Sequence, residues 1–376
     1  MNTPIKPTNS EWARRAKEYQ SQLTMPTGAL GQLLELGQQL STIQETVRPT
    51  TEPTAVVVMA ADHGIAEEGV SAYPQEVTQQ MVRNFLSGGA AVNVLSRRHN
   101  IRMIVVDAGL KETVEIQPTN SELTWVGNQA IERGTQNFLK QTAMTSDQTN
   151  SAIQLGRTVV QSHLVPEDVR VVALGEMGIG NSTSAAALAA ALTGISPANV
   201  TGKGTGVDVA GWRHKVDVIQ RALDKHFPNQ MKPIEPNLAL QCVGGFEIAA
   251  LVGTALEAAA HRMIVVLDGL ISTVAGLVAA RLDPNITGYL VASHKGTEPG
   301  HKHVLAALGL RPLLDLELRL GEGTGAVLAY SLLQSAADIM RDMATFQSAQ
   351  VSDRRTQEQE SNGDGTNHST DGSFSE

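Results

Sequence analysis

Short runs of apolar residues recur along the chain, and most end in glycine or a small polar residue. The runs span residues 55–60, 101–106, 169–174, 263–267 and 289–292, with a weaker one at 238–243. Each has the length of a strand buried on both faces, and helical patterns lie between them. This alternation predicts an α/β fold with a Rossmann-like, mostly parallel sheet covered by helices on both faces.

The two ends of the chain lie outside this alternation. Residues 9–46 contain two helical patterns separated by Met25-Pro26-Thr27-Gly28, and residues 326–343 form one long, largely apolar helical pattern. We expect residues 1–50 and 326–350 to form a small helical domain beside an α/β domain of residues 51–325. Residues 351–376 hold too few apolar side chains to offset the entropy of ordering, which predicts a disordered tail.

Composition and charge limit the partners. The 376 residues are 41% hydrophobic but only 3% aromatic, so a sizeable core must be built from Ala, Val, Leu and Ile. The net charge of −9 argues against binding to nucleic acid or an anionic membrane. The most apolar stretch, 248–280, is interrupted by Glu257, His261, Arg262 and Asp268, which predicts a core helix–strand–helix passage and no membrane span.

The chain has a single cysteine, Cys242, in an apolar run. One cysteine excludes an intrachain disulfide and indicates a reducing cytoplasm, and its surroundings predict a buried, inert thiol. The N-terminus has no apolar signal core, in keeping with a cytoplasmic location.

A glycine-rich loop follows one predicted strand. It reads Gly175-Glu176-Met177-Gly178-Ile179-Gly180-Asn181-Ser182-Thr183 and leads into an Ala-rich helix that stops at Gly194. We expect Asn/Ser/Thr side chains to cap this helix. Such a loop lies at the carboxyl edge of a parallel sheet, where the first amides of the helix favour a phosphate or carboxylate. A tight, well-capped turn without a ligand is the alternative.

Two further groups of residues have less specific patterns. The glycine cluster at 201–208 matches neither a Walker loop nor a dinucleotide fingerprint, and Lys203, Arg213 and Lys215 either serve a phosphate or form a solvated basic patch. Metal-ligand candidates are Asp62-His63 and the histidines at 294, 301 and 303. Their spacing matches no known ligand set, so we expect no metal and predict that the histidines of 293–303 are exposed.

Glu322 stands between Gly321 and Gly323, after an apolar run and before the long helical pattern. The flanking glycines remove Cβ bulk, so the backbone can press close to a ligand while the acid points into a pocket. A lone acid held in this way suits a reaction that removes one proton without a metal. Considered alone, a solvated glutamate in a Gly-rich turn is the simpler interpretation.

Taken together, the motifs resemble the nicotinate-nucleotide–dimethylbenzimidazole phosphoribosyltransferase family. The resemblance runs in order through Pro26-Thr27-Gly28-Ala29-Leu30-Gly31, Ala61-Asp62-His63-Gly64, Glu68 to Pro74, Gly175 to Thr183, Leu267-Asp268-Gly269 and Arg319 to Gly325. Thr27-Gly28-Ala29 stands where the family often has Pro-Gly-Ser, which is a conservative departure.

The resemblance implies a reaction that moves ribose 5-phosphate from nicotinate mononucleotide to 5,6-dimethylbenzimidazole, giving α-ribazole 5′-phosphate and nicotinate, in assembly of the cobalamin lower ligand. It also implies a Rossmann-like sheet with a small helical domain, a homodimer, and no cofactor. Pyrophosphate-using phosphoribosyltransferases usually carry an adjacent acidic pair for magnesium. No such pair precedes a Thr-Gly loop here, in keeping with a metal-free mononucleotide donor.

By the same resemblance, Glu322 is the base that takes the acceptor's N–H proton. The other substrate-binding residues it implies lie around the donor, its phosphate and the benzimidazole; they are Gly175, Glu176, Gly178, Gly180, Asn181, Asp208, Lys215, Ser293, Gly296, Thr297, Tyr73 and Leu320. Burial should raise the pKa of Glu322 while the following helix N-terminus should lower it, and the sequence leaves the balance open.

Two other classes of protein share parts of this pattern. A nicotinamide-dependent oxidoreductase needs Gly-x-Gly-x-x-Gly directly after a strand and an acid at the end of the next strand, which do not occur together here. A non-catalytic binding protein would keep the glycine loops but gain nothing from Glu322. The choice among benzimidazole, adenine and phenolic acceptors depends on pocket details beyond a motif.

Overall fold

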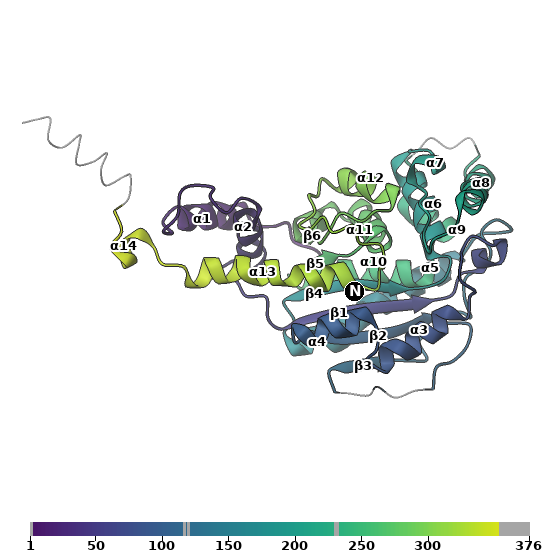
Figure 1. Cartoon of the computed structure of the whole chain (residues 1–376), viewed down its shortest axis with the longest axis horizontal. Helices are drawn as coiled ribbons and strands as arrows, with labels where there is room; N and C mark the ends of the chain where they lie inside the picture. The colour runs from purple at the N-terminus through teal and green to yellow at the C-terminus, as the bar shows by residue number, and fades with distance from the viewer. Residues whose placement is uncertain (1–2, 116–117, 119–120, 229–232, 353–376) are drawn as a thin grey trace, which may run out of the picture.

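The computed structural model describes residues 3–115, 118, 121–228 and 233–352 (Figure 1). Most of the predicted tail, residues 353–376, lies outside this part of the chain.

A parallel sheet forms the centre of the molecule. Its strands are β1 (Thr54–Ala61), β2 (Arg102–Gly109), β3 (Leu123–Val126), β4 (Val171–Met177), β5 (Ile264–Leu267) and β6 (Leu290–Ala292). Their order is β3-β2-β1-β4-β5-β6, and each neighbouring pair is parallel. The chain therefore turns from one side of the sheet to the other between β1 and β4, the switch point at which doubly wound folds bind ligands. The predicted α/β fold is confirmed.

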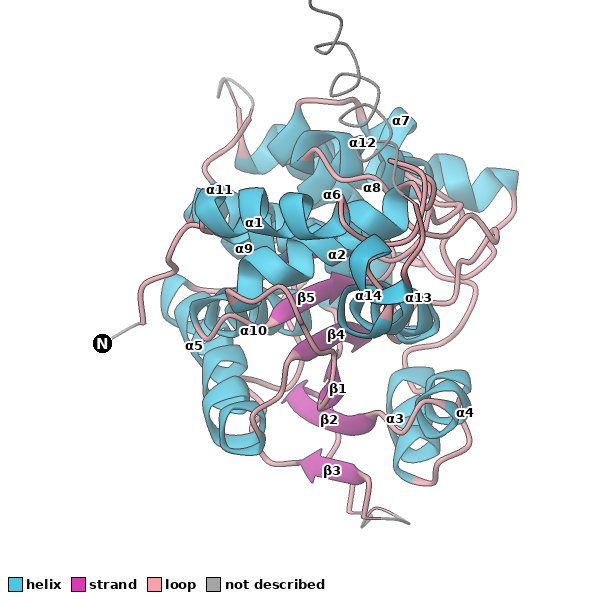
Figure 2. Ribbon diagram, turned by 90° about the vertical axis from the view of Figure 1, so that its left-hand side faces the viewer, coloured by secondary structure: helices cyan, strands magenta, loops and turns pink. Residues whose placement is uncertain are grey.

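Helices cover both faces of the sheet (Figure 2). The α-helices of the described residues are α1 (Ser10–Gln20), α2 (Gln32–Gln44), α3 (Val77–Leu86), α4 (Ala91–Arg98), α5 (Ser146–Val159), α6 (Asn181–Thr193), α7 (Pro197–Val200), α8 (Val209–His226), α9 (Pro236–Val243), α10 (Phe246–Ala260), α11 (Leu270–Leu282), α12 (Pro299–Leu308), α13 (Thr324–Asp342) and α14 (Phe346–Ala349). The helices α3, α4 and α13 lie on one face and α10, backed by α5, on the other. Because both faces are covered, every residue of β1 is buried.

Five of the six predicted strands are present, and one prediction is wrong. Residues 238–243 form most of α9, in which Pro236 occupies the first turn and the Glu235 carboxylate accepts the amides of Asn237 and Leu238. A short apolar run fits a buried strand or a buried helix equally well, and this start signal decides for the helix. The edge strand β3 was not predicted, because only Leu123 of its four residues is fully buried.

The terminal helices pack beside one another, and Figure 1 shows α1 and α2 alongside α13. Gln20 donates to the Leu34 carbonyl and contacts the Met340 sulfur, at 2.9 and 3.2 Å, which joins the three helices. The first half of α13 also packs on β4 and α4. A separate helical domain therefore stays a prediction.

The structure also bears on the predictions for Cys242 and for a membrane span. Cys242 is buried, as predicted, and burial raises the pKa of its thiol to about 11. Across the described ranges, no helix has the length and apolar character needed to cross a membrane.

The contact between α5 and α10 depends on two glycines. A Cβ atom on Gly253 would overlap the Ile153 carbonyl oxygen, and one on Gly156 would overlap that of Ala250. Since these are backbone atoms of packed helices, side-chain rotation cannot relieve the overlap.

We therefore predict that Gly253→Ala lowers the free energy of unfolding by about 3 kcal/mol or more, despite the better helix propensity of alanine. Chemical denaturation measures the change. Gly269→Ala is the matched control, because a Cβ at Gly269 has no atom within 4 Å. Equal stability of the two variants would contradict the prediction.

Candidate active site

A cavity of about 500 Å³ opens at the carboxyl edge of the sheet, near the switch point between β1 and β4. Its walls come from α3, from the segments that follow β4, β5 and β6, and from residues 318–322. The glycine loop after β4 thus lies where parallel sheets bind ligands.

Glu322 reaches this cavity from a strained turn. Gly321, Glu322 and Gly323 have φ values of 82°, 65° and 87°, so three consecutive residues are left-handed. Glycine adopts this conformation at little cost, whereas a glutamate needs a surrounding structure that holds it there. The neighbouring strand supplies part of it, because a Cβ on Gly175 would lie 2.5 Å from the Glu322 carbonyl oxygen. The turn and β4 therefore touch backbone to backbone.

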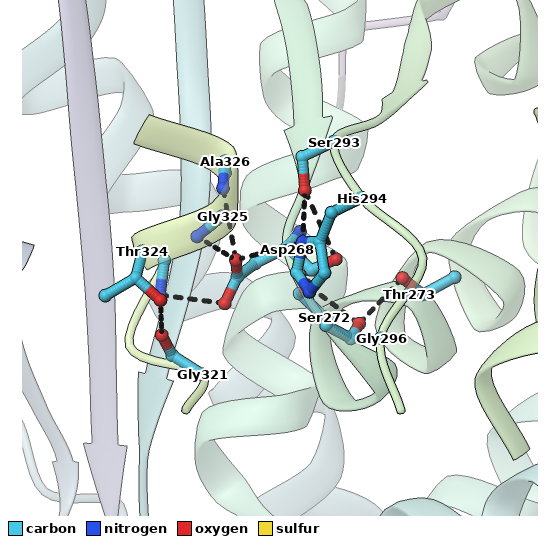
Figure 3. A network of polar contacts seen from close by, with 12 residues as sticks. Asp268, Ser272, Thr273, Ser293, His294, Gly296, Gly321, Thr324, Gly325 and Ala326 are labelled. Atoms are coloured by element: carbon cyan, nitrogen blue, oxygen red, sulfur yellow. Dashed lines mark hydrogen bonds and ion pairs between the residues drawn. The ribbon is translucent and has the colours of Figure 1, made fainter. Parts of the chain in front are cut away.

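The Asp268 carboxylate fixes the other side of the turn (Figure 3). It directly follows β5 and accepts the amides of Gly323, Gly325 and Ala326 at 3.0, 2.7 and 3.1 Å. The first amides of α13 are therefore satisfied by Asp268, and their positive field is directed at this carboxylate instead of at Glu322.

Burial consequently dominates the titration of Glu322. The residue is 6% exposed, and its Oε2 has no hydrogen-bond partner within the protein. Burial raises the pKa of Glu322 to about 7, and the negative charge of Asp268 adds to the increase. This answers the question that the sequence left open: near pH 7 the group can both hold and release a proton.

A second buried acid, Glu176, lies across from this turn. The side-chain amide of Asn181 donates to Glu176 Oε2. A Cβ on Gly321 would overlap the other carboxylate oxygen, Glu176 Oε1. Burial raises the pKa of Glu176 to about 8, with contributions from the negative charges of Asp268 and Glu247. Glu176 is therefore mostly neutral at pH 7.

The start of α6 differs from the prediction. Its N-cap is Gly180, at φ 100°, which has no side chain to cap the helix. The side-chain amide of Asn181 donates to Glu176 and does not cap the helix either. The predicted Asn/Ser/Thr cap is therefore wrong, whereas the predicted stop at Gly194 is confirmed.

Part of the cavity wall is polar. Ser182 and Gly204 line it, and behind them the Lys215 ammonium donates to Ser182 Oγ at 2.8 Å. Burial lowers the pKa of this lysine to about 8, although it stays mostly charged at neutral pH. Its positive charge therefore lies directly behind the cavity wall, next to Ser182.

The prediction of exposed histidines is wrong at positions 294 and 301. His294 Nδ1 lies 2.9 Å from Ser293 Oγ, and His301 Nε2 lies 3.0 Å from Thr273 Oγ1. Both rings are buried, which lowers their pKa values to about 4 and 3, so they are neutral. Apart from the masked positions, the chain has no cluster of three His, Cys, Asp or Glu side chains arranged to hold a metal.

The structure brings eight of the sequence-predicted site residues to the cavity wall: Tyr73, Glu176, Gly178, Asn181, Gly296, Thr297, Leu320 and Glu322. Gly175, Gly180, Lys215 and Ser293 lie behind the wall. Asp208 is exposed and caps α8 by accepting the Gly211 amide at 2.8 Å.

The sequence predicted no substrate contact for three residues of the site: Ser182, Asp268 and Glu298. For Asp268 a signal existed, because an acid directly after a buried parallel strand points to the ligand edge of the sheet. The contacts of the other two depend on loops whose paths the sequence pattern does not give.

A doubly wound sheet with a nucleotide-sized cavity at its switch point fits the phosphoribosyltransferase family, which matches residues 5–351 of the chain.

The names of individual relatives are more specific than this family description. The nicotinate-nucleotide–dimethylbenzimidazole phosphoribosyltransferase of Pseudomonas putida is 48% identical over 340 residues, covering 90% of this chain and 94% of the relative. That of Chloroflexus aggregans is 46% identical, covering 93% and 97%. The crystal structure of the Thermus thermophilus enzyme of this name matches with a TM-score of 0.84 at 42% identity, covering 92% and 99%. The chain belongs to the nicotinate-nucleotide–dimethylbenzimidazole phosphoribosyltransferase family.

The raised pKa of Glu322 gives a prediction about stability. Its folded-state pKa lies above the ordinary 4.5, so between pH 4.5 and 7 the native state binds more protons than the unfolded state. The contribution of Glu322 to stability therefore decreases as the pH rises through this window. Relative to wild type, Glu322→Gln should gain on the order of 2–3 kcal/mol between pH 5 and 8.

Denaturant titration at both pH values tests this, with the exposed Glu112→Gln as the matched loss of one charge. A stability difference between Glu322→Gln and wild type that does not change with pH would show that Glu322 has an ordinary pKa.

Proposed function

We propose that this protein transfers the 5-phosphoribosyl group of nicotinate mononucleotide to 5,6-dimethylbenzimidazole, forming α-ribazole 5′-phosphate and nicotinate in cobalamin lower-ligand assembly. The observation that carries the proposal is the unpartnered, buried Oε2 of Glu322 at the wall of a nucleotide-sized cavity. A buried acceptor without a protein partner is costly, and a ligand N–H supplies the missing hydrogen bond.

The acceptor's chemistry requires one base. One ring nitrogen of the benzimidazole attacks C1′ of the ribose while the other carries a proton that must leave. Glu322 accepts this N–H, which orients the ring and then removes the proton as the new C1′–N bond forms. A base with a pKa of about 7 is suited to this transfer at neutral pH.

The donor's chemistry requires no acid. As the C1′–N bond of the nucleotide breaks, its electron pair passes to the pyridinium nitrogen, and nicotinate leaves with a neutral ring. The bond that breaks is β and the bond that forms is α, so attack comes from the opposite face with inversion. The protein's part is to hold both rings in line across C1′.

The cavity wall offers groups that suit each substrate. Val77 and Met81 of α3, with Tyr73 and Leu320, are apolar lining residues that suit the dimethylbenzimidazole ring. Ser182, Gly204 and Thr297 supply polar lining groups that suit the nucleotide's phosphate, with the Lys215 charge behind Ser182. The remaining predicted contacts, including Asp208, belong to this proposal as donor contacts carried over by family resemblance.

The assembly and compartment belong to the proposal as well. Tyr73 and Leu320 are 56% and 57% exposed, although both line the cavity. Exposed large apolar side chains at a cavity mouth support a homodimer whose partner covers them. A single cysteine supports the cytoplasm as the place of action. The proposed reaction uses no cofactor.

The experiment that tests the function is a product assay. The purified protein is incubated with nicotinate mononucleotide and, separately, dimethylbenzimidazole, adenine or a phenolic base. Mass spectrometry identifies the product, and the proton coupling at C1′ gives its anomeric configuration. We expect α-ribazole 5′-phosphate to form fastest. Absence of any ribosylated base would refute the proposal, and faster transfer to another base would change the acceptor.

Glu322→Gln should lower turnover by roughly 10²–10⁴-fold, the usual contribution of a general base, because the amide keeps the shape but cannot take the proton. Calorimetric titration should give dissociation constants for both substrates close to those of wild type. Near-normal turnover in the folded variant would exclude Glu322 as the base.

A further inference from the structure

A short glycine loop, residues 202–204, lies at the cavity between the positive charge of Lys215 and the negative charge of Glu298. On one side, a Cβ on Gly204 would lie 2.9 Å from Lys215 Nζ. On the other side, a Cβ on Gly202 would overlap the Glu298 carboxylate, and Glu298 Oε1 accepts the Gly204 amide at 3.0 Å. The two glycines therefore let the loop approach both charged side-chain ends closely.

Both charged groups are shielded from water, Lys215 almost entirely and half-buried Glu298 at one carboxylate oxygen. Lys215 is 1% exposed, and Glu298 Oε2 is buried without a hydrogen-bond partner in the protein. Burial opposes the charge of Lys215, whereas the negative charge of Glu298 favours it. Since an isolated buried charge is costly, each group partly compensates the other across the loop.

We infer that Glu298 is a positioning residue for the nucleotide donor: it holds the Gly202–Gly204 loop over Lys215 and keeps that ammonium charged behind Ser182. This inference rests on the proposed function, because it takes the donor's phosphate to bind at Ser182 and Gly204.

The direction in which donor affinity changes when the Glu298 charge is removed distinguishes this positioning role from direct repulsion of the phosphate. Glu298 lines the cavity, so its own negative charge repels a phosphate. If repulsion were its main influence, removal of the charge would tighten donor binding. If it acts through the loop and Lys215, removal of the charge weakens donor binding.

Glu298→Gln provides the test, since the amide oxygen can still accept the Gly204 N–H. We expect the KM and the calorimetric Kd for nicotinate mononucleotide to rise about tenfold, as for loss of one charge-assisted contact. The KM for dimethylbenzimidazole and kcat should stay within about twofold of wild type. The exposed Glu112→Gln, which loses the same charge away from the cavity, should match wild type.

A double-mutant cycle with Lys215→Met shows whether the effect passes through the lysine. Lys215→Met with Glu298→Gln should bind the donor as weakly as Lys215→Met alone. Additive losses, or an unchanged or tighter donor Kd in folded Glu298→Gln, would overturn the inference. Donor binding is measured without turnover, so an inactive wild type would refute the proposed function while the cycle still decides the role of Glu298.

Discussion

The acceptance of three backbone amides by the Asp268 carboxylate is the interaction on which the site depends. It joins the end of β5 to the start of α13 and thereby fixes the left-handed turn at residues 321–323. It also satisfies the amides that would otherwise stabilise a negative charge on Glu322. With that stabilisation directed elsewhere, burial determines the protonation of Glu322, which is what a base working at neutral pH requires.

The same arrangement of buried acids lowers the stability of the folded protein near neutral pH. Burial raises the pKa values of Glu176, Asp268 and Glu322, and the charge of Asp268 contributes to the shifts of the other two. Each of these groups makes the native state less stable as the pH rises toward neutrality. The continuous apolar core on both faces of the sheet tolerates this cost. A left-handed glutamate and three buried acids thus lie together at this site, as is common in catalytic sites.

Much of the fold could be predicted from the sequence, because buried parallel strands have a strong local pattern. Residues 55–60 and 171–174 are continuous apolar runs, and both form central strands. The apolar run 238–243 satisfies strand and helix equally, so the prediction there was wrong. The short edge strand β3 is only partly buried and lacks the pattern altogether.

The candidate site could be predicted where a motif places a residue at the end of a strand or just after it. Glu176, near the end of β4, and Gly178 and Asn181 after it line the cavity for this reason. Contacts between distant segments were beyond the sequence, since nothing near Glu298 indicates that it meets Gly204. Asp208 is exposed and caps α8, so its predicted contact with the donor stays a prediction from the family resemblance.

We propose that burial in this turn makes Glu322 a base for neutral pH. A carbon-13 NMR titration of the glutamate side-chain carboxyls in the free protein tests this, with Glu322→Gln assigning the signal. We expect a midpoint of about 7 for Glu322. A midpoint near the ordinary 4.5 would contradict it.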